Sequence, residues 1–171
     1  MNITIRKETT ADYPVVYQVV QSAFQQALHT NHDEQNLVER LRKSDAYIPA
    51  LSLVAEVDGK VVGHIMFTRI SVGDKQALAL APLSVIPEFQ NQGIGSRLIT
   101  SGHEIAKEMG FEWCILVGHA AYYPRFGYKK ASAYGIQSPF EVPEDAFMAL
   151  HLQGNEPMLN GMVIYPAAFE L

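Results

Sequence analysis

The segment QNQGIGS, residues 90–96, carries two glycines one position apart, directly before a stretch with the apolar spacing of a helix. Glycine has no Cβ atom, so Gly93 and Gly95 let a bulky group approach the main chain closely. The first turn of a helix adds about four unpaired N–H groups and the positive end of the helix dipole. This segment can therefore hold an anion such as a pyrophosphate.

Three other interpretations of the glycine segment compete with this one. A P-loop requires a lysine directly after its second glycine, and Ser96 stands there instead. A dinucleotide-binding fingerprint requires a third glycine or an alanine, and Leu98 occupies that position. A plain strand-to-helix turn without a ligand remains as the third alternative. The closely spaced glycines favour a phosphate-binding turn that is neither a P-loop nor a dinucleotide-binding fingerprint.

Two further groups of reactive side chains predict no additional chemistry. His29 and His32 lie close to Asp33, but the spacing lacks a third firm ligand, so no metal site is predicted. Cys114 stands within the apolar run WCILV, where a packed and inert thiol is expected.

The glycine segment lies between a predicted strand and a predicted helix of a mixed α/β fold, in which helices pack on one twisted sheet. Asp58-Gly59 separates two strand-like runs and predicts a hairpin. Pro82 interrupts the next strand and predicts a bulge or a splay of the sheet there. The predicted strands are 3–9, the two arms of 51–72, 76–86, 113–117, 147–152 and 161–166, and the predicted helices are 12–28, 34–44, 96–109 and a short one within 120–128.

The composition is typical of one globular domain, which we expect to span residues 1–171. Apolar residues make up 48% and charged residues 18% of the chain, which excludes a disordered protein. The net charge of −5 argues against nucleic acid or an anionic membrane as the main partner. We expect a cytoplasmic protein, because the chain shows no signal peptide, no apolar run near the roughly 18 residues of a membrane span, and a single cysteine.

Two motifs of the chain resemble those of a known family. The segment LSVIPEFQNQGIG, from Leu83 to Gly95, resembles the acetyl-CoA signature of the GCN5-related N-acetyltransferases (GNAT). In YYPRFGY, Tyr123 stands four residues before Gly127-Tyr128, which is similar to the second motif of that family. The C-terminal FMALHL and GMVIYPAAF resemble a bacterial branch labelled YhbS-like. The resemblance implies a twisted, mostly antiparallel sheet with central splayed parallel strands and helices on both faces.

The resemblance also implies acetyl-CoA as the cosubstrate, with no metal. The pantetheine arm would pair with the backbone of Leu83, Ser84 and Val85, as an added strand pairs with a sheet edge. Leu83 N–H would donate to the acetyl oxygen as negative charge develops on it. Tyr122 would line the cofactor groove. The main-chain groups that would hold the pyrophosphate belong to Gln90, Asn91, Gln92, Gly93, Ile94, Gly95 and Ser96.

For catalysis, the resemblance places a general acid at Tyr123, because a tyrosine near the sulfur can protonate the departing thiolate. An ordinary buried aromatic residue is the alternative for Tyr123. Many relatives carry a glutamate on the strand before the motif, and ALALAPLSV has no acid there. His64 and His119 are the candidates for the base, with a structural role as the alternative for each. Glu34 would line the acceptor pocket, unless it is simply a solvated acid at a helix N-terminus.

Two functions of different classes follow from this resemblance. The first is acetyl transfer to a primary amine of a small molecule or peptide, directly within a ternary complex. An acyl-enzyme is not expected, because Ser84 and Ser96 lack a Ser–His–acid arrangement. The second is a CoA-binding sensor or interaction module without catalysis. A general nucleotide binder is a weaker third. The acceptor and the oligomeric state, a homodimer included, stay open, because the shared fold does not determine them.

Overall fold

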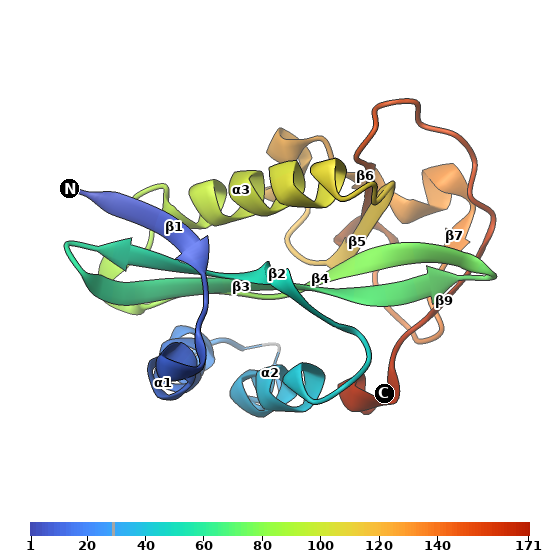
Figure 1. The fold of residues 1–171 in the computed structure, drawn as a ribbon. Coiled ribbons are helices and arrows are strands. Elements are labelled where there is room, and N and C mark those ends of the chain that lie inside the picture. The colour runs from blue at the N-terminus through green and yellow to red at the C-terminus, as the bar shows by residue number, and fades with distance from the viewer. Residues whose placement is uncertain (29) are drawn as a thin grey trace.

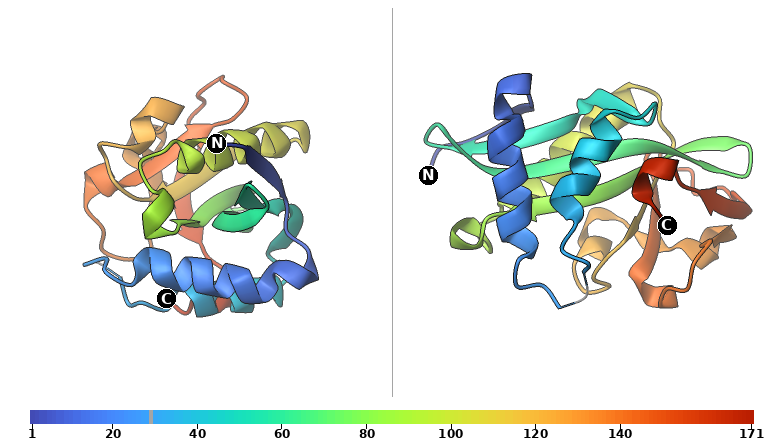
Figure 2. Two further views of the ribbon diagram at one scale, coloured as in Figure 1. Left: turned by 90° about the vertical axis from the view of Figure 1, so that its left-hand side faces the viewer. Right: turned by 90° about the horizontal axis from the view of Figure 1, so that it is seen from below.

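The computed structural model describes residues 1–28 and 30–171, whose strands form one sheet with helices on both faces (Figure 1). Helices α1 (Tyr13–Phe24) and α2 (Glu34–Arg42) cover one face, and α3 (Ile94–Glu108) covers the other (Figures 1 and 2). The strands are β1 (Ile3–Lys7), β2 (Tyr47–Val57), β3 (Lys60–Val72), β4 (Lys75–Val85), β5 (Trp113–Val117), β6 (Lys129–Lys130), β7 (Ile136–Gln137), β8 (Phe147–His151) and β9 (Gly161–Ile164).

The sheet has the order β1-β2-β3-β4-β5-β8-β6, and β9 pairs with both β3 and β7. All of these pairs are antiparallel except β4 with β5 and β7 with β9. The predicted fold class is therefore confirmed, with its mostly antiparallel sheet and helices on both faces.

Several predicted elements have different ends in the structure. The hairpin between β2 and β3 turns at Asp58 and Gly59, where φ is 51° and 84°, as an Asp-Gly turn requires. Helix α1 ends at Phe24 and not at residue 28. The short helix predicted within 120–128 is a single 3-10 turn, η3 (Tyr123–Phe126). Strands β6 and β7 have two residues each, too few to leave an alternating pattern in the sequence.

The two central strands diverge, as the family resemblance implied. Strand β4 pairs with β5 only through Leu78 with Cys114 and Ala79 with Ile115. Beyond these pairs β4 continues along β3, and β5 continues along β8. We call this divergence, between residues 80–85 of β4 and residues 116–117 of β5, the splay.

A β-bulge begins the splay and confirms the prediction made from Pro82. Ile65 pairs with Leu83 and Phe67 with Leu80, so two residues of β4 stand opposite one residue of β3. A bulge of this kind bends its strand and increases the local twist. The proline therefore stands where β4 turns away from β5.

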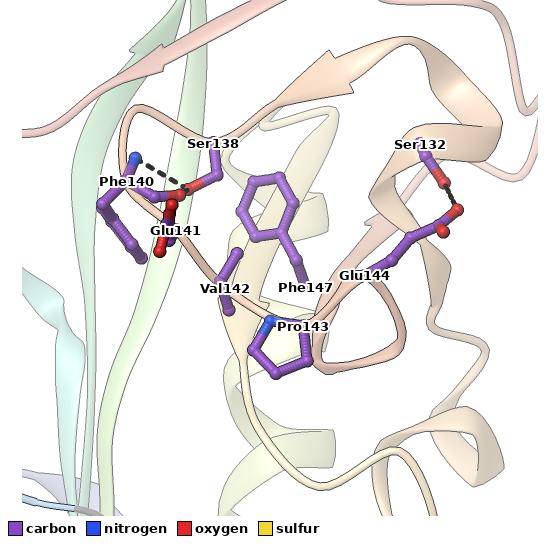
Figure 3. A pocket seen from close by; sticks show the side chains of 8 residues that line it. All are labelled: Ser132, Ser138, Phe140, Glu141, Val142, Pro143, Glu144 and Phe147. Carbon is purple, nitrogen blue, oxygen red and sulfur yellow. Dashed lines mark hydrogen bonds between the residues drawn. The ribbon is translucent and has the colours of Figure 1, made fainter.

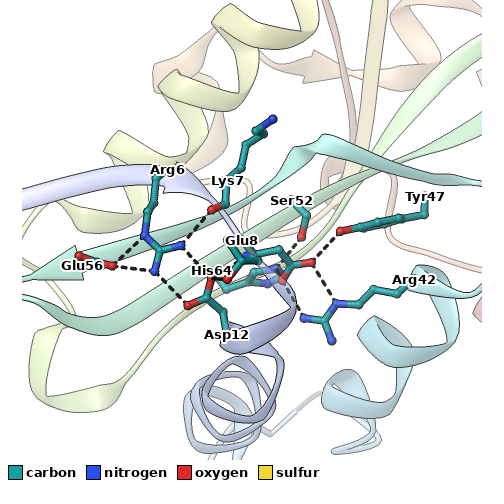
Figure 4. A network of polar contacts seen from close by, with 10 residues as sticks. Arg6, Lys7, Glu8, Asp12, Arg42, Tyr47, Ser52, Glu56 and His64 are labelled. Carbon is teal, nitrogen blue, oxygen red and sulfur yellow. Dashed lines mark hydrogen bonds and ion pairs between the residues drawn. The ribbon is translucent and has the colours of Figure 1, made fainter.

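Side chains on β3 alternate between the two faces of the sheet. Phe67 packs toward α3, where its ring centroid lies 6.1 Å from that of His103. His64 points to the opposite face, toward Arg42 of α2 (Figure 4). On β4, Ser84 stands opposite His64, and Leu83 stands opposite Ile65. Ser84 therefore faces α1 and α2, and Leu83 faces α3.

The C-terminal segments cover the part of the sheet that α1 and α2 leave free (Figure 2, right). Their apolar side chains form a second cluster around Trp113. The ring of Trp113 packs edge-on against that of Tyr134, with 4.9 Å between the two ring centroids. This cluster also holds Ile115 of β5 and Phe147 of β8. Within the described ranges, no helix has the length and apolar character needed to cross a membrane.

Candidate active site

The glycine segment forms an exposed turn that leads into α3. Gly93 has a φ of 85°, in the left-handed region, and is the residue directly before the helix. A Cβ atom added at Gly93 would meet no protein atom within 4 Å, so the surface beside it is open. The helix begins at Ile94 and not at Ser96 as predicted, which places Gly95 and Ser96 in its first turn. Their N–H groups are among those that lack a partner within the helix.

Two glutamine side chains brace this turn. Gln90 Nε2 donates to Val85 O at 2.9 Å, and Gln92 Nε2 donates to Glu88 O at 3.2 Å. Asn91 is exposed and also adopts a positive φ, of 62°. The side chains of both glutamines are therefore directed back to the main chain, and the open surface at Gly93 is left to the backbone.

Hydrogen bonding decides which peptide groups of β4 face the splay. Ile86 N–H donates to Val62 O at 2.9 Å, and the peptide groups of alternate residues of an antiparallel strand point the same way. Ser84 belongs to the set that points to β3, where it pairs with His64. Leu83 and Val85 therefore direct their N–H and C=O groups away from β3, toward the diverging end of β5. Of the three backbone contacts that the sequence suggested, these two face the splay, and Ser84 faces the neighbouring strand.

Tyr122, the residue directly before η3, and Tyr123, its first residue, lie on the α3 side of the splay. Tyr122 Oη is 3.3 Å from Ser96 Oγ, which joins η3 to the first turn of α3. Tyr123 packs edge-on against Tyr122 and lies against Gly118, the residue that follows β5. Burial raises the pKa of Tyr123 above its ordinary value, so the phenol stays protonated at neutral pH. A protonated phenol at this position is able to act as an acid.

The two histidine candidates lie in different surroundings. His119 is exposed, and its carbonyl oxygen accepts hydrogen bonds from the N–H groups of Tyr122 and Tyr123 at 3.0 and 3.3 Å. His64 is fully buried on the opposite face of the sheet. Its Nε2 lies 3.0 Å from Ser52 Oγ and 3.5 Å from Glu8 Oε1 (Figure 4).

Glu8 is the centre of a buried polar network around His64. Its carboxylate accepts hydrogen bonds from Arg42 at 2.7 and 3.0 Å and from Tyr47 at 2.9 Å (Figure 4). Burial opposes ionisation of Glu8, but hydrogen bonds from His64 and Arg42 lower the pKa of the carboxyl to about 2. Burial lowers the pKa of His64, so this imidazole is neutral at pH 7. Among the described residues, His64 Nδ1 and Ser84 Oγ have no hydrogen-bond partner.

Glu34 and the histidine cluster lie near the start of α2. Glu34 is the first residue of that helix, and its Oε1 is buried with no partner among the described residues. Asp33 pairs with Arg40 at 3.0 Å, and His32 is exposed with a φ of 58°. His29 lies outside the described residues. Across the described ranges, no three His, Cys, Asp or Glu side chains gather as metal ligands would.

Sequence reasoning missed a cavity of about 720 Å³ near the C-terminal end of β5 (Figure 3). Ser132, Ser138, the run from Phe140 to Glu144, and Phe147 line it. Phe147 points into its centre, between Phe140 on one side and the hydrogen-bonded pair of Ser132 and Glu144 on the other (Figure 3). The segment has no helical or alternating pattern that would have indicated its place in the fold. The only signal in the sequence was the presence of aromatic and acidic residues close together, such as Phe140 and Glu141.

A family model described as the acetyltransferase (GNAT) family matches residues 13–128. The chain belongs to the GNAT family. The matched range contains the glycine turn, the splay and η3, so the geometry described above is that of the family's shared region. The turn at Gly93 and the peptide groups of Leu83 and Val85 thus form the candidate coenzyme site of this GNAT protein.

Similarity to individual GNAT proteins extends over most of the chain. The uncharacterised N-acetyltransferase YjhQ of Escherichia coli K12 is 43% identical over 66% of this chain and 65% of its own length. The uncharacterised N-acetyltransferase YhbS of the same strain is 30% identical over 92% of this chain and 91% of its own. A crystal structure of E. coli YhbS in complex with CoA covers all of this chain and 93% of that one, with a TM-score of 0.90 at 26% identity.

A second solved structure is similar over nearly the full length. It is a GNAT family acetyltransferase from Brucella melitensis in complex with acetyl-CoA, with a TM-score of 0.83 and 35% identity over 98% of both chains. These relatives confirm that the chain is of the acyltransferase class and of the YhbS-like bacterial branch that the sequence suggested.

Proposed function

We propose that this GNAT protein transfers an acetyl group from acetyl-CoA to a primary amine of a small molecule or peptide, directly within a ternary complex. One juxtaposition carries the proposal: the open turn at Gly93 lies next in the chain to a strand whose Leu83 and Val85 peptide groups face the splay. The similar structures from B. melitensis and E. coli were obtained with acetyl-CoA and CoA, which supports the same coenzyme here.

The turn and the strand would divide the coenzyme between them. Main-chain N–H groups from Asn91 to Ser96 would hold the pyrophosphate, because they are at a helix N-terminus and no Cβ at Gly93 blocks the approach. Gln90, which the sequence also suggested, already donates its N–H to Pro87 O at 3.3 Å. The Val85 and Leu83 peptide groups would pair with the amides of the pantetheine arm. Tyr122, which already contacts Ser96, would close the side of this groove.

Three groups of this chain would then carry the reaction, to which acetyl-CoA supplies an activated thioester. Leu83 N–H would donate to the carbonyl oxygen as the amine nitrogen forms its bond to the acetyl carbon. Tyr123 would give its proton to the sulfur as the carbon–sulfur bond breaks. His119 would take the proton that the amine releases, because it is exposed beside η3 whereas His64 is enclosed. Glu34 would attract the amine from the α2 side.

Thiol release from acetyl-CoA across a panel of amines tests this proposal. We expect Tyr123→Phe to lower kcat by about 10² or more, the usual range for a general acid, with CoA affinity unchanged. Tyr134→Phe is the matched control, since its hydroxyl contacts Glu156 in the second apolar cluster, away from the turn. Full activity in Tyr123→Phe would remove Tyr123 from the mechanism.

A CoA-binding module without catalysis is the second candidate. Strand β4, from Lys75 to Val85, carries no carboxylate that could act as a base, and this observation favours it. Tight CoA binding without turnover of any amine would support this candidate over the enzyme. Stronger thermal stabilisation by ATP or NAD than by CoA would overturn both. The single, buried Cys114 fits a reducing cytoplasm, the compartment that we propose for the reaction.

A further inference from the structure

The cavity lined by Ser132, Ser138, the run from Phe140 to Glu144, and Phe147 is not explained by coenzyme binding. None of its lining residues belongs to the glycine turn, to β4 or to η3. Its volume of about 720 Å³ falls within the range of roughly 300–1,000 Å³ that is usual for small-molecule sites. A second ligand, distinct from the coenzyme, is therefore to be sought for it.

The cavity lies beside the splay, on the face of the sheet opposite to α3. Phe147 pairs with Val117, the last residue of β5, and Gly118 N–H donates to Ala146 O at 2.9 Å. Phe147 shares the second apolar cluster with Ile115, which precedes Val117 by two positions and so points to the same face. The glycine turn and Tyr122 lie on the α3 side. A ligand in the cavity would therefore reach the splay from the side that the coenzyme does not use.

Half of the eight residues that line the cavity are apolar. Phe140, Val142, Pro143 and Phe147 supply rings and branched carbon atoms (Figure 3). The ring centroid of Phe140 lies 5.8 Å from that of Tyr165. Ser138 fixes the backbone of this segment, because its hydroxyl donates to Phe140 O at 2.7 Å. Such a wall favours a ligand with an apolar, ring-sized body.

The charges of the cavity have one sign. Of its eight lining residues, Glu141 and Glu144 are acidic and none is basic. Glu144 is oriented by Ser132, whose hydroxyl donates to Glu144 Oε1 at 2.9 Å. Both carboxylates are exposed, so they would attract a cation from solvent and repel an anion.

We propose that this cavity binds the acceptor, and that the acceptor is an amine with an apolar, ring-containing body and no negative charge. The proposal rests on the proposed acetyl transfer and specifies its substrate class. Such an amine arrives as an ammonium ion, which the two carboxylates attract, and its ring packs on Phe140 and Phe147. The reacting nitrogen then lies toward Val117 and the splay.

A matched pair of substrates tests the charge selection. In thiol-release assays, 2-phenylethylamine should have a kcat/KM at least about tenfold above that of 4-(2-aminoethyl)benzoate, which adds one carboxylate to the same body. Glu144→Gln should narrow this ratio by about twofold to fivefold, the usual effect of one exposed charge. Asp145→Asn is the control, since it removes the neighbouring charge that does not line the cavity. If both variants had an equal effect, the charge selection would come from the overall negative charge of this surface and not from the cavity. That result would overturn the proposal.

Variants of Phe140 test the ring contact. Phe140→Ala should raise KM for 2-phenylethylamine about tenfold and leave that of ethanolamine unchanged, and Phe140→Leu should restore most of the loss. An unchanged KM for 2-phenylethylamine would overturn the proposal. So would a change in sedimentation in place of a change in KM, because the cavity would then be an interface with a second copy.

The failure of the proposed function would look different. CoA affinity, measured by calorimetry on the same variants, reports on the coenzyme site, which shares no residue with the cavity, and should not change. Wild-type protein that binds no CoA, or that turns over no amine, would refute acetyl transfer. The affinity of 2-phenylethylamine for the CoA-loaded protein, also measured by calorimetry, tests binding in the cavity without turnover. Its absence in wild type would overturn the cavity assignment by itself.

Discussion

Replacing Gly93 with valine would separate the backbone requirement of the turn from its contact with the coenzyme. Gly93 has a φ of 85°, and a residue with a side chain pays about 1–2 kcal/mol for the left-handed region. For a chain of this size, each kcal/mol lowers Tm by about 2–4 °C, so the variant should melt about 2–8 °C lower. The added Cβ would not clash with the protein, because no atom lies within 4 Å of its position. It would instead occupy the surface assigned to the pyrophosphate.

Gly154 offers a closely matched control for this substitution. Its φ is 87°, and a Cβ atom there also meets no atom within 4 Å, but it lies in the turn after β8. Gly93→Val and Gly154→Val should therefore lose similar stability, and only Gly93→Val should lose CoA affinity. A ligand at about 100 times its Kd stabilises a protein by roughly 2.7 kcal/mol, which Gly154→Val should retain.

Calorimetry and thermal melts with and without CoA provide the assay. We expect Gly93→Val to weaken CoA binding by at least about tenfold, which is 1.4 kcal/mol. An unchanged Kd in folded Gly93→Val protein would refute the cradle at the turn. An equal loss of CoA affinity in Gly154→Val would show that strain anywhere in the fold impairs binding. It would refute the argument that CoA binds at the turn around Gly93.

Three further predictions concern the buried network and the base. Arg42→Ala should lower the free energy of unfolding by about 3–5 kcal/mol in urea melts, because it leaves Glu8 charged and enclosed. Loss of the exposed Lys129, whose ion pair with Glu156 lies in solvent, should change stability little. The pKa of Glu8 falls from 4.5 to about 2 on folding, so ionised Glu8 stabilises the fold. This stabilisation is complete above pH 4.5 and should be lost as the pH falls toward 2. The free energy of unfolding should drop by about 3 kcal/mol over this range, measured in melts at successive pH values. Burial lowers the pKa of His64, so a further loss of stability should begin as the pH falls through the ordinary histidine pKa of 6.5. Constant stability from pH 7 to 3 would contradict the predictions for Glu8 and His64. His119→Ala should lower kcat by about 10² or more in thiol-release assays, and an unchanged kcat would exclude it as the base.

The parts of this molecule that depend on local backbone chemistry could be predicted from the sequence. The Asp58-Gly59 hairpin, the bulge at Pro82 and the left-handed turn at Gly93 each follow from what one or two residue types permit. Helix and strand ends were less accurate, because α1 stops at Phe24 although apolar residues continue to Leu28. Tertiary packing, and not spacing, decides such ends.

Contacts between distant residues could not be predicted in this way. Glu8 and Arg42 each look like solvated surface charges in the sequence, and only the fold places them together against His64. Their pairing changes the assessment of His64 from a candidate base to an enclosed partner of a carboxylate. The cavity around Phe140 was missed for a similar reason, since its segment has no periodicity and its position beside β5 follows from the pairing of Phe147 with Val117.

The splay also gives a physical reason for direct transfer under the proposed function. The turn, Tyr122 and Leu83 lie on the α3 side, whereas the cavity and the second apolar cluster lie on the other. An intact sheet would separate two such ligands by its own thickness, and β4 and β5 part just where both would have to meet. The coenzyme and the acceptor could then be bound at once without competing for one surface. Kinetics should accordingly show intersecting lines in double-reciprocal plots, and parallel lines, the sign of a ping-pong mechanism, would contradict this arrangement.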